Sequence, residues 1–482
     1  MVKSEKVLGN FMWRLLERFG AQGVTLIVSI VLARLLDPEV YGVIALVTVI
    51  TTLLNVFVDS GLGTALIQKK NADDLDFSTV FFFNIGMCIV LYVGLFFLAP
   101  LVAAFYEIPE LTAIVRVLGL SLIISGVKNI QQAYVSRNML FKKFFFATIA
   151  GTIGAAVVGI TMAFLGYGVW AIVCQYLFNM FIDTVILWIT VRWRPKFMFS
   201  FQRLKGLFGF GSKLLGVSLI TTLYNDLRQI LIGKLYTTSD LAFYNKGKQF
   251  PELINTNINT SIDSILLPAM SKEQDDVTTI KAMTRRSIKT CTYIMSPFLV
   301  GLAMCGEAFI ELLLTEKWLF CVPYMRIFCI TYLFSPIFTA NYNAYKALGK
   351  SNLYLRVSIV SKFFGIIVLL ITLPHGVMVM AYGVLVSNFI NQLVCTFPNL
   401  KLMKYSYPEQ IKDILPNLLL AAFMGAVVYV VNFLNLNPIL TLVIQIPVGA
   451  VVYVLGSMIF KLESYVYVLN TLKSFLKKRR KA

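Results

Sequence analysis

Residues 76–106 read DFSTVFFFNIGMCIVLYVGLFFLAPLVAAFY. After the aspartate at its start, this segment contains no charged residue. At 1.5 Å per residue, an α-helix of this length exceeds the roughly 30 Å thickness of a bilayer's hydrocarbon core. Apolar runs longer than about 18 residues are typical of transmembrane helices. The segment therefore predicts a helix that crosses a membrane.

Segments of the same kind recur along all 482 residues, of which 58% are hydrophobic and only 14% charged. The mean hydropathy is +0.77, and a soluble protein does not carry so many long apolar runs. We therefore expect an all-α polytopic membrane protein with fourteen transmembrane helices. The predicted segments are 8–36, 41–67, 76–106, 110–139, 142–166, 168–192, 204–236, 240–270, 282–314, 321–348, 354–374, 378–400, 410–434 and 438–460.

The 43 lysines and arginines are distributed unevenly over the connections between these segments. Most lie at the two chain ends or in even-numbered connections, whereas the odd-numbered ones hold only Arg34, Lys234 and Lys317. By the positive-inside rule, this distribution predicts that both termini are cytoplasmic. The net charge of +19 then orients helices and contacts anionic lipid, so we expect no nucleic-acid partner. The other basic residues lie inside apolar segments: Arg14, Arg18, Arg116, Lys128, Lys213, Arg228, Lys246, Lys248, Arg326 and Lys362.

The chain also contains an internal repeat. A displacement of 200 residues aligns LARL at 32–35 with IGKL at 232–235, and a displacement of 210 aligns VRV at 115–117 with MRI at 325–327. Six crossings return a chain to the same side, so the two copies have parallel orientation, and transporters built from two such halves carry the substrate between them. The predicted parts are an N-terminal six-helix lobe over 1–200, a pseudo-symmetric second lobe over 201–405, and a C-terminal helical hairpin with a basic tail over 406–482.

Polar residues within the predicted membrane segments form stripes. The segment 240–270 carries Lys248, Glu252, Asn255, Asn259 and Asp263 at helical spacing, which puts them on one face. Similar stripes occur in the segments 8–36, 41–67 and 204–236. Together with 240–270, these are the first two segments of each copy of the repeat. Together they indicate a shared hydrated cavity. The candidate cavity residues are Arg14, Arg18, Gln22, Asn55, Asn225, Arg228, Lys246, Lys248, Asn255 and Asn259.

The excess of basic over acidic groups in these stripes suits an anionic passenger, since arginine binds phosphate or carboxylate as a fork. The acidic residues have two interpretations: they bind a coupling H⁺ or Na⁺, or they are counter-ions to the bases. A structural alternative also stands, in which the charges pair to hold helices together and the amides form interhelical hydrogen bonds worth under about 1 kcal/mol each. The acidic candidates are Glu17, Asp59, Asp226, Glu252 and Asp263.

Catalytic and metal-binding motifs are not found. The seven cysteines are scattered through apolar stretches, and the single histidine, His375, lies in a Pro-His-Gly turn. There is no phosphate-binding glycine loop after a strand. We therefore expect no enzymatic activity, no metal and no cofactor, and any driving energy has to come from an ion gradient or the membrane potential.

Seven short motifs recur at specific spacing along nearly the whole chain. They are LARLLDPEVYG at 32–42, DSGLGTALIQ at 59–68, LAP at 98–100, GYGVWA at 166–171, WRP at 193–195, GFGS at 209–212 and LPA at 267–269. These motifs resemble those of Wzx-type polysaccharide flippases, in the branch related to the colanic acid exporter. At 237–242, TTSDLA replaces the more glycine-rich junction of that family.

The resemblance implies a V-shaped pair of six-helix lobes in the bacterial inner membrane. It also implies translocation of an undecaprenyl-diphosphate-linked oligosaccharide, a precursor of O-antigen, capsule or exopolysaccharide, by alternating access. Arg14 and Arg18 resemble an arginine pair in the first helix of the related lipid II flippases, and we expect them to receive the diphosphate at the inner mouth. Lys246 and Lys248 are then expected to hold it in the outward state.

Three alternatives stand beside this function, two of which belong to other functional classes. An ion-coupled multidrug antiporter of the same superfamily requires an acidic cavity for cationic drugs, which the basic excess disfavours. A lipid II flippase shares the predicted cavity chemistry. A membrane polymerase or ligase requires large outer loops with reactive groups, and the short outer connections disfavour it.

Overall fold

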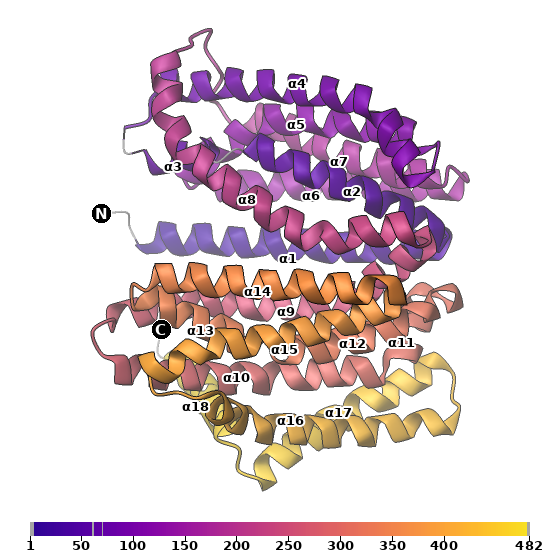
Figure 1. Cartoon of the computed structure of the whole chain (residues 1–482), viewed down its shortest axis with the longest axis vertical. Helices are drawn as coiled ribbons and strands as arrows, with labels where there is room; N and C mark the ends of the chain where they lie inside the picture. Colours follow the sequence, from indigo (N-terminus) through magenta and orange to yellow (C-terminus); the bar gives the residue numbers. More distant parts are fainter. Residues whose placement is uncertain (1–3, 60–61, 70, 480–482) are drawn as a thin grey trace. The chain divides into compact units, whose positions relative to one another are not determined.

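A computed structural model describes residues 4–59, 62–69 and 71–479 (Figure 1). Backbone only is described for 4–19, 59, 68, 209–211, 213, 214, 351, 471, 472 and 474–479, so the side chains of Arg14, Glu17, Arg18 and Asp59 lie outside the described part. The described residues form helices and connections without a strand. By its internal contacts the chain divides into two compact units, one ending at Ala242 and the other beginning at Phe243.

The first unit consists of α1 to α8 and the start of α9. Its helices are α1 (Ser4–Leu35), α2 (Pro38–Asp59), α3 (Leu62–Gln68), α4 (Asp74–Tyr106), α5 (Leu111–Arg137), α6 (Phe141–Phe164), α7 (Val169–Thr190), α8 (Phe201–Leu235) and α9 (Thr238–Lys272).

The second unit contains the rest of α9, the later α-helices and three short 3₁₀ segments. These are α10 (Val277–Met304), α11 (Gly306–Leu314), η1 (Glu316–Cys321), α12 (Val322–Leu333), α13 (Ser335–Ala347), α14 (Ser351–Thr372), η2 (Leu373–His375), α15 (Val377–Leu402), α16 (Tyr407–Val430), η3 (Val431–Leu434), α17 (Pro438–Ile459) and α18 (Glu463–Arg479).

Ten helical stretches of the described chain are long and apolar enough to cross a membrane, or eleven if the bent pair α10 and α11 is one span. The expected all-helical, multi-pass membrane architecture is thereby confirmed. The helices α8 and α9 do not pass this test, because each carries a polar stripe, and the part of α1 whose side chains are described contributes the shorter apolar stretch Gly20–Leu35. The count of fourteen spans, and the limits of the two predicted lobes and the hairpin, stay predictions.

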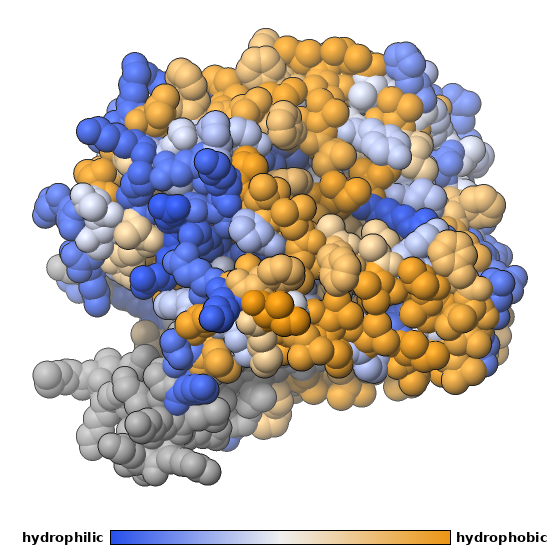
Figure 2. Space-filling view, turned by 90° about the horizontal axis from the view of Figure 1, so that it is seen from below, coloured by the Kyte–Doolittle hydropathy of each residue, from blue (hydrophilic) through white to orange (hydrophobic). Residues whose placement is uncertain are grey.

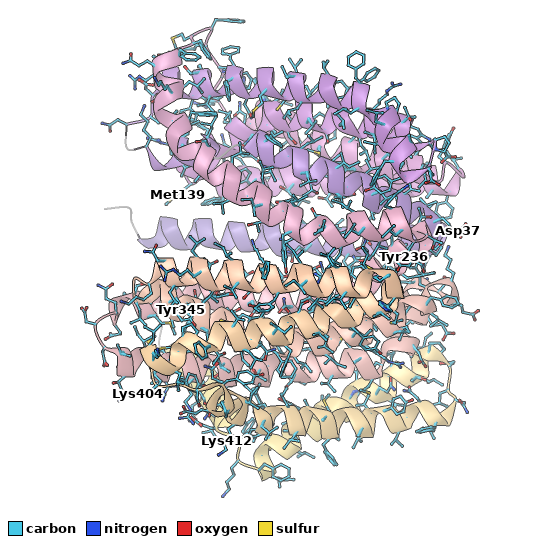
Figure 3. All side chains as sticks on the ribbon, in the orientation of Figure 1. Asp37, Met139, Tyr236, Tyr345, Lys404 and Lys412 are labelled. Atoms are coloured by element: carbon cyan, nitrogen blue, oxygen red, sulfur yellow. The ribbon has the colours of Figure 1, made fainter. Side chains whose placement is uncertain are left out.

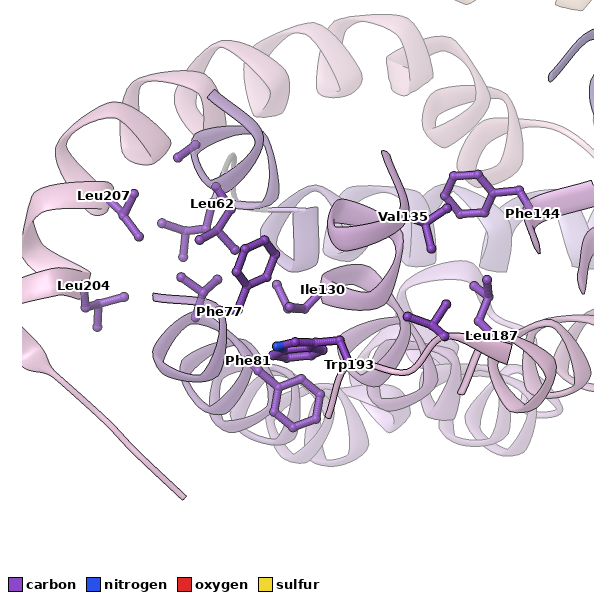
Figure 4. Close-up of a cluster of buried hydrophobic side chains, with 14 of the residues drawn as sticks. Leu62, Phe77, Phe81, Ile130, Val135, Phe144, Leu187, Trp193, Leu204 and Leu207 are labelled. Atoms are coloured by element: carbon purple, nitrogen blue, oxygen red, sulfur yellow. The ribbon is translucent and has the colours of Figure 1, made fainter. Parts of the chain in front are cut away.

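A hydrophobic core near one end of the first unit joins α3 through α8 (Figure 4). Phe77 and Phe81 of α4 pack around Trp193, whose ring stacks on Tyr134 of α5 at a centroid distance of 6.0 Å. Leu204 of α8 belongs to the same core. The start of α8, which the repeat assigns to the second copy, therefore packs within the first unit.

Local sequence explains where these helices begin and end. Asp73 and Asp76 form a reciprocal capping box at the start of α4, in which each carboxylate accepts a hydrogen bond from the other residue's backbone N–H. Gly376, at a φ of 100°, makes the turn between η2 and α15, a conformation that glycine adopts without steric cost. These signals keep the connections short.

The two ends of the first unit differ as the charge distribution predicts. Asp37 and Tyr236, in odd-numbered connections, lie together at one end, while Met139, in an even-numbered connection rich in basic residues, lies at the other (Figure 3). On the face of the second unit shown in Figure 2, apolar side chains form a band with hydrophilic side chains toward both ends. An apolar band between polar ends is what a bilayer requires.

The hairpin α16–α17 packs against α10 within the second unit. Tyr453 of α17 donates its hydroxyl to the backbone oxygen of Tyr293 at 2.8 Å, and Leu420, Met424 and Val428 of α16 share the hydrophobic core with Tyr293. The two tyrosine rings also lie 5.2 Å apart. The hairpin is thus an integral part of the second unit.

Candidate functional site

The polar stripe of α9 forms a hydrogen-bonded ladder with α13. Asn255 Oδ1 accepts bonds from Ser335 Oγ at 2.5 Å and from Asn259 Nδ2 at 2.6 Å. One turn on, Thr339 Oγ1 donates to Asn259 Oδ1 at 3.1 Å. These contacts join positions four residues apart on both helices, as expected for two helices that run side by side.

The ladder continues for one further turn, where Asn343 Nδ2 donates to Asp263 Oδ1 at 2.5 Å. Interhelical hydrogen bonds of this kind contribute on average about 0.6 kcal/mol each within a membrane. Three of the predicted site residues, Asn255, Asn259 and Asp263, are therefore engaged with α13. Their partners on α13 were not among the predicted site residues, although Ser335, Thr339 and Asn343 follow the same four-residue spacing and could have been found by it.

The last pair of this ladder, Asp263 with Asn343, has small residues at the corresponding positions of the first unit. By the displacements of 200 and 210, Gly63 corresponds to Asp263, and Ala133 to Asn343. A Cβ atom on Gly63 would lie 3.8 Å from the Cβ of Ala133 and 3.2 Å from Asn129 Oδ1. Small residues in close contact thus replace a charged hydrogen-bonded pair, so the two copies differ at this pair of positions.

The two predicted lysines of α9 lie in different environments. Lys246 is buried, with an exposed fraction of 5%, and its ammonium lies 5.6 Å from the ring centroid of Trp318 in η1. Lys248 is more accessible and pairs with Glu252 one turn later, at 3.3 Å. The pair places one basic and one acidic candidate together on α9. Lys246, by contrast, is shielded from water and faces an aromatic ring.

The remaining described candidates lie on α1, α2 and α8. Gln22, Asn55, Asp226 and Arg228 are half-buried, and Asn225 is exposed. The Nε and Nη2 atoms of Arg228 are shielded from solvent and have no hydrogen-bond partner in the part of the chain that the structure describes. A guanidinium placed in this way is suited to an incoming anion, because burying it without a partner is costly.

Lys128, one of the basic residues inside the predicted membrane segments, forms an ion pair inside the first unit. Its ammonium lies 2.5 Å from Oδ2 of Asp183, with both side chains mostly buried. Lys128 belongs to α5 and Asp183 to α7, two helices of membrane-spanning length. Asp183 was not among the predicted site residues, although Gln175, Asn179 and Asp183 follow one another at four-residue spacing and the same periodicity could have found it.

We predict that Lys128→Met lowers the free energy of unfolding by roughly 3–5 kcal/mol, because it leaves the Asp183 carboxylate buried without its counter-ion. The double variant Lys128→Met/Asp183→Asn should recover most of that loss, since it removes both charges. Chemical unfolding of the purified protein in detergent measures both effects. Equal stability of the single and double variants would show that the pair is not coupled.

Two arginines related by the repeat satisfy carbonyl oxygens at irregular points of helices. Arg116 Nε donates to the carbonyl of Phe96 at 3.2 Å, and Pro100 deprives that carbonyl of its usual helical donor. Arg326 Nε donates at 3.1 Å to the carbonyl of Ala303, in the last turn of α10. These two basic residues of the membrane segments therefore have a local structural function.

The two helix junctions related by the 200-residue displacement contact each other in the first unit. Ser239 Oγ donates to Glu39 Oε1 at 2.7 Å. A Cβ atom on Gly42 would lie only 2.0 Å from the backbone oxygen of Thr238, so glycine is required for this approach. We call the contact of residues 39–42 with residues 237–242 the junction contact.

A second ion pair stabilises the same end of the first unit. Lys234 Nζ lies 2.8 Å from Glu107 Oε1, and it also faces the ring of Phe105 at 5.2 Å. The hydrogen bond and charge of Lys234 hold the pKa of the Glu107 carboxyl below its ordinary value. The pair is exposed, so its contribution is small and falls with salt. Of the three bases in odd-numbered connections, Lys234 is thus paired with an acidic residue.

An apolar groove of about 570 Å³ lies within the second unit. It is bordered by Phe250, Leu253 and Ile254 of α9, by the region of the break between α10 and α11, and by the hairpin α16–α17. Gln445 is its main polar residue, and its amide nitrogen already donates to Asn432 and to the carbonyl of Val428. The groove therefore offers hydrocarbon contacts over nearly its whole surface.

An ion-pair network ties the hairpin to α10 at the basic end of the second unit. Asp413 of α16 is buried and lies 2.7 Å from Arg285 Nε and 3.3 Å from Lys289 Nζ. Tyr405 also donates its hydroxyl to Asp413 at 2.8 Å. Lys289 continues the network to Glu463 of α18 at 2.7 Å.

Asp413→Asn should lower the free energy of unfolding by about 2 kcal/mol, because buried hydrogen bonds to a charged group are lost. Glu409→Gln is the matched control on the same helix. Its contacts with Lys281 and Arg285, at 3.5 and 3.7 Å, are longer and partly exposed, so its loss should stay under about 1 kcal/mol. Thermal unfolding of the purified variants tests the difference, and a larger loss for Glu409→Gln would contradict it.

Comparison with known proteins agrees with this architecture. "Teichuronic acid biosynthesis protein TuaB" of Bacillus subtilis (strain 168) is 24% identical over 416 residues, which cover 84% of this chain and 85% of that protein. "Lipopolysaccharide biosynthesis protein WzxC" of Escherichia coli (strain K12) is 23% identical over 438 residues, 88% of each chain.

A solved structure titled "Lipid II flippase MurJ, inward closed conformation" is similar with a TM-score of 0.77 and 16% identity, covering 93% of this chain and 98% of that one. At this identity the likeness establishes the fold. Residues 31–323 match the family described as "Polysaccharide biosynthesis protein". The match spans more than half of the sequence, and it confirms the resemblance to polysaccharide flippases. The chain therefore belongs to the polysaccharide biosynthesis protein family.

Proposed function

We propose that this protein is a flippase that moves a lipid-linked oligosaccharide across a bacterial inner membrane. The observation that carries the proposal is the two-sided character of α9. Phe250, Leu253 and Ile254 border the apolar groove, whereas Lys248 and Glu252, which are accessible, belong to the polar stripe. A single helix thus offers hydrocarbon contacts on one side and hydrogen-bonding groups on another.

Such a helix suits an amphiphile with a long hydrocarbon chain and a polar head. A methylene group occupies a volume similar to that of a water molecule, about 30 Å³, so a groove of 570 Å³ holds roughly twenty chain carbons. A groove of this capacity is larger than a small apolar drug requires, and it fits part of an isoprenoid chain. A hydrocarbon tail in the groove would leave the attached head group near the polar side of α9.

The relatives supply the class of head group. TuaB is named for teichuronic acid biosynthesis and WzxC for lipopolysaccharide biosynthesis, and both names refer to complex carbohydrates. We therefore propose an oligosaccharide repeat unit on undecaprenyl diphosphate as the substrate. Its sugars would bind amides and hydroxyls, and its diphosphate would bind basic groups.

The basic candidates differ in how well their surroundings suit binding of the diphosphate. Arg228 has shielded guanidinium nitrogens without a described partner, and Lys248 is accessible beside Glu252. Lys246 is buried, so its proposed contact in the outward state requires a different conformation of α9. Arg14 and Arg18 keep their proposed role at the inner mouth on the strength of the sequence resemblance.

We further propose fourteen transmembrane helices with both termini in the cytoplasm. The ten apolar helical spans, the bent pair α10–α11, and the polar helices α1, α8 and α9 together make this number. The three polar helices are tolerated in the membrane because their stripes face protein or a hydrated cavity. The organisation into two six-helix lobes and a hairpin follows from the repeat.

Transport by alternating access requires an outer end that opens and closes. We propose that the junction contact is the outer gate, since it joins two odd-numbered connections, which the charge distribution places on the outer side. Coupling to H⁺ or Na⁺ through Glu17, Asp59, Asp226, Glu252 or Asp263 stays a proposal, and we propose no chemical reaction.

The test is to delete the gene in the source organism and to determine the leaflet in which lipid-linked repeat units accumulate. We expect accumulation facing the cytoplasm, with accessibility to an added periplasmic glycosidase restored when the gene is returned. Export at the normal rate without the gene would refute the proposed function.

A further inference from the structure

The groove owes its form to a break in the chain between α10 and α11. The two helices meet at an angle of 73°, and Cys305 alone separates them. Gly301 and Leu302 border the groove from before the break, and Cys305 and Phe309 border it from the break onward. The angle therefore determines how far apart the two sides of the groove lie.

The size of that effect follows from helix geometry. The nine residues of α11 extend over about 13.5 Å at 1.5 Å per residue. Straightening the 73° bend would displace the far end of α11 by roughly 16 Å and Phe309 by roughly 7 Å. A displacement of several ångströms at Phe309 would remove one side of the groove.

Arg326 of α12 contacts the chain on both sides of the break. Its Nε donates to the carbonyl of Ala303, and its Nη2 lies 3.0 Å from Glu307 Oε1 at the start of α11. Helix ends leave carbonyl groups without intrahelical donors, and the guanidinium supplies one here. Arg326 itself does not border the groove.

Close packing of Gly306 keeps the start of α11 near α12. A Cβ atom on Gly306 would lie 2.8 Å from the terminal carbon of Met325 and 3.2 Å from Val322. Arg326 directly follows Met325 in the chain. The same turn of α12 thus contributes both the packing surface and the guanidinium that fix the bend.

We propose that Arg326 is a positioning residue for the hydrocarbon chain of the substrate: by holding the bend between α10 and α11, it keeps the groove open at the width the chain needs. The inference rests on the proposed function, because that function supplies the hydrocarbon chain. The charged guanidinium of Arg326 would thereby affect how the protein recognises the uncharged hydrocarbon chain of the substrate.

Arg116 provides a matched control within the same molecule. It is related to Arg326 by the repeat and makes the same type of bond, from Nε to the Phe96 carbonyl, in the first unit. Neither Arg116 nor Phe96 borders the groove. Removing either guanidinium costs one charge-assisted hydrogen bond to a carbonyl, but only the loss at Arg326 should disturb the groove.

The experiment introduces a photoreactive amino acid at Ile446, an exposed residue that borders the groove, and measures its crosslinking to radiolabelled undecaprenyl diphosphate in nanodiscs. Arg326→Gln should reduce the crosslink by about tenfold, the factor that corresponds to losing a hydrogen bond from a charged group. Arg116→Gln should leave it unchanged. Arg326→Lys, which keeps the charge near Glu307 but lacks the planar fork, should show an intermediate loss.

Crosslinking by Arg326→Gln at the unaltered level would overturn the inference. An equal loss in Arg326→Gln and Arg116→Gln would also overturn it, because the effect would then reflect general destabilisation, which thermal unfolding of the same samples measures. If the protein with native Arg326 does not crosslink the probe, the proposed function fails instead, and this inference fails with it.

Discussion

Gly42→Val is expected to reduce transport roughly 10- to 100-fold while the protein still folds. A Cβ atom at position 42 would lie 2.0 Å from the backbone oxygen of Thr238, and a backbone group cannot yield as a flexible side chain does. Forcing extra atoms into such a contact costs roughly 1–3 kcal/mol, which corresponds to this range of population change. Valine should therefore separate the two junctions and destabilise the closed outer end.

The measurement is the transfer of lipid-linked repeat units to the outer leaflet in cells that carry the variant as their only copy. Gly86→Val is the control, because a Cβ atom at position 86 of α4 meets no neighbouring atom within 4 Å. Both variants should reach the membrane in equal amounts. Normal transport by Gly42→Val would show that the junction contact is not needed for the cycle.

Gly301→Leu is expected to reduce transport at least about tenfold by filling the groove. Gly301 borders the groove, and its nearest neighbour, the terminal carbon of Met424, would lie 4.0 Å from a new Cβ atom. The side chain therefore enters open space without disturbing the fold. Even one added methylene group in a fitted apolar pocket changes recognition by about 10-fold or more, and leucine adds several.

The control for this variant is Gly94→Leu. Gly94 lies on the apolar helix α4, is exposed, and has no atom within 4 Å of a new Cβ, but it does not border the groove. Transport should be measured in proteoliposomes with a fluorescent lipid-linked oligosaccharide whose label is quenched from one side. If both leucine variants transport at the same rate, the groove is not part of the substrate path.

Much of the fold follows from residue order because the bilayer imposes a simple requirement. Every backbone polar group must be satisfied within its own segment, so long apolar runs such as 76–106 become helices. The all-helical, multi-pass architecture was therefore predictable, and so was the separation of Met139 from Asp37 and Tyr236 at opposite ends of the first unit. The family was also predictable, since its motifs occupy connections whose spacing is visible in the sequence.

Helical periodicity identified which residues share a face of α9, but it could not identify what that face meets. Asn255, Asn259 and Asp263 bond to α13, a helix some 80 positions further along the chain. The spacing of a stripe is the same whether it lines a water-filled cavity or another helix. Only the packing of α9 against α13 distinguishes the two.

The same limit applies to charges that stand alone. Lys128 had no role until the fold brought it to Asp183, and Arg116 and Arg326 had none until it brought them to free carbonyl groups. Helical periodicity and hydropathy describe one helix at a time, and together with the motifs they predict the structural class and the family, while the orientation in the membrane stays a prediction. Ion pairs, capped breaks and grooves depend on the distance between residues far apart in the chain, which tertiary packing alone decides.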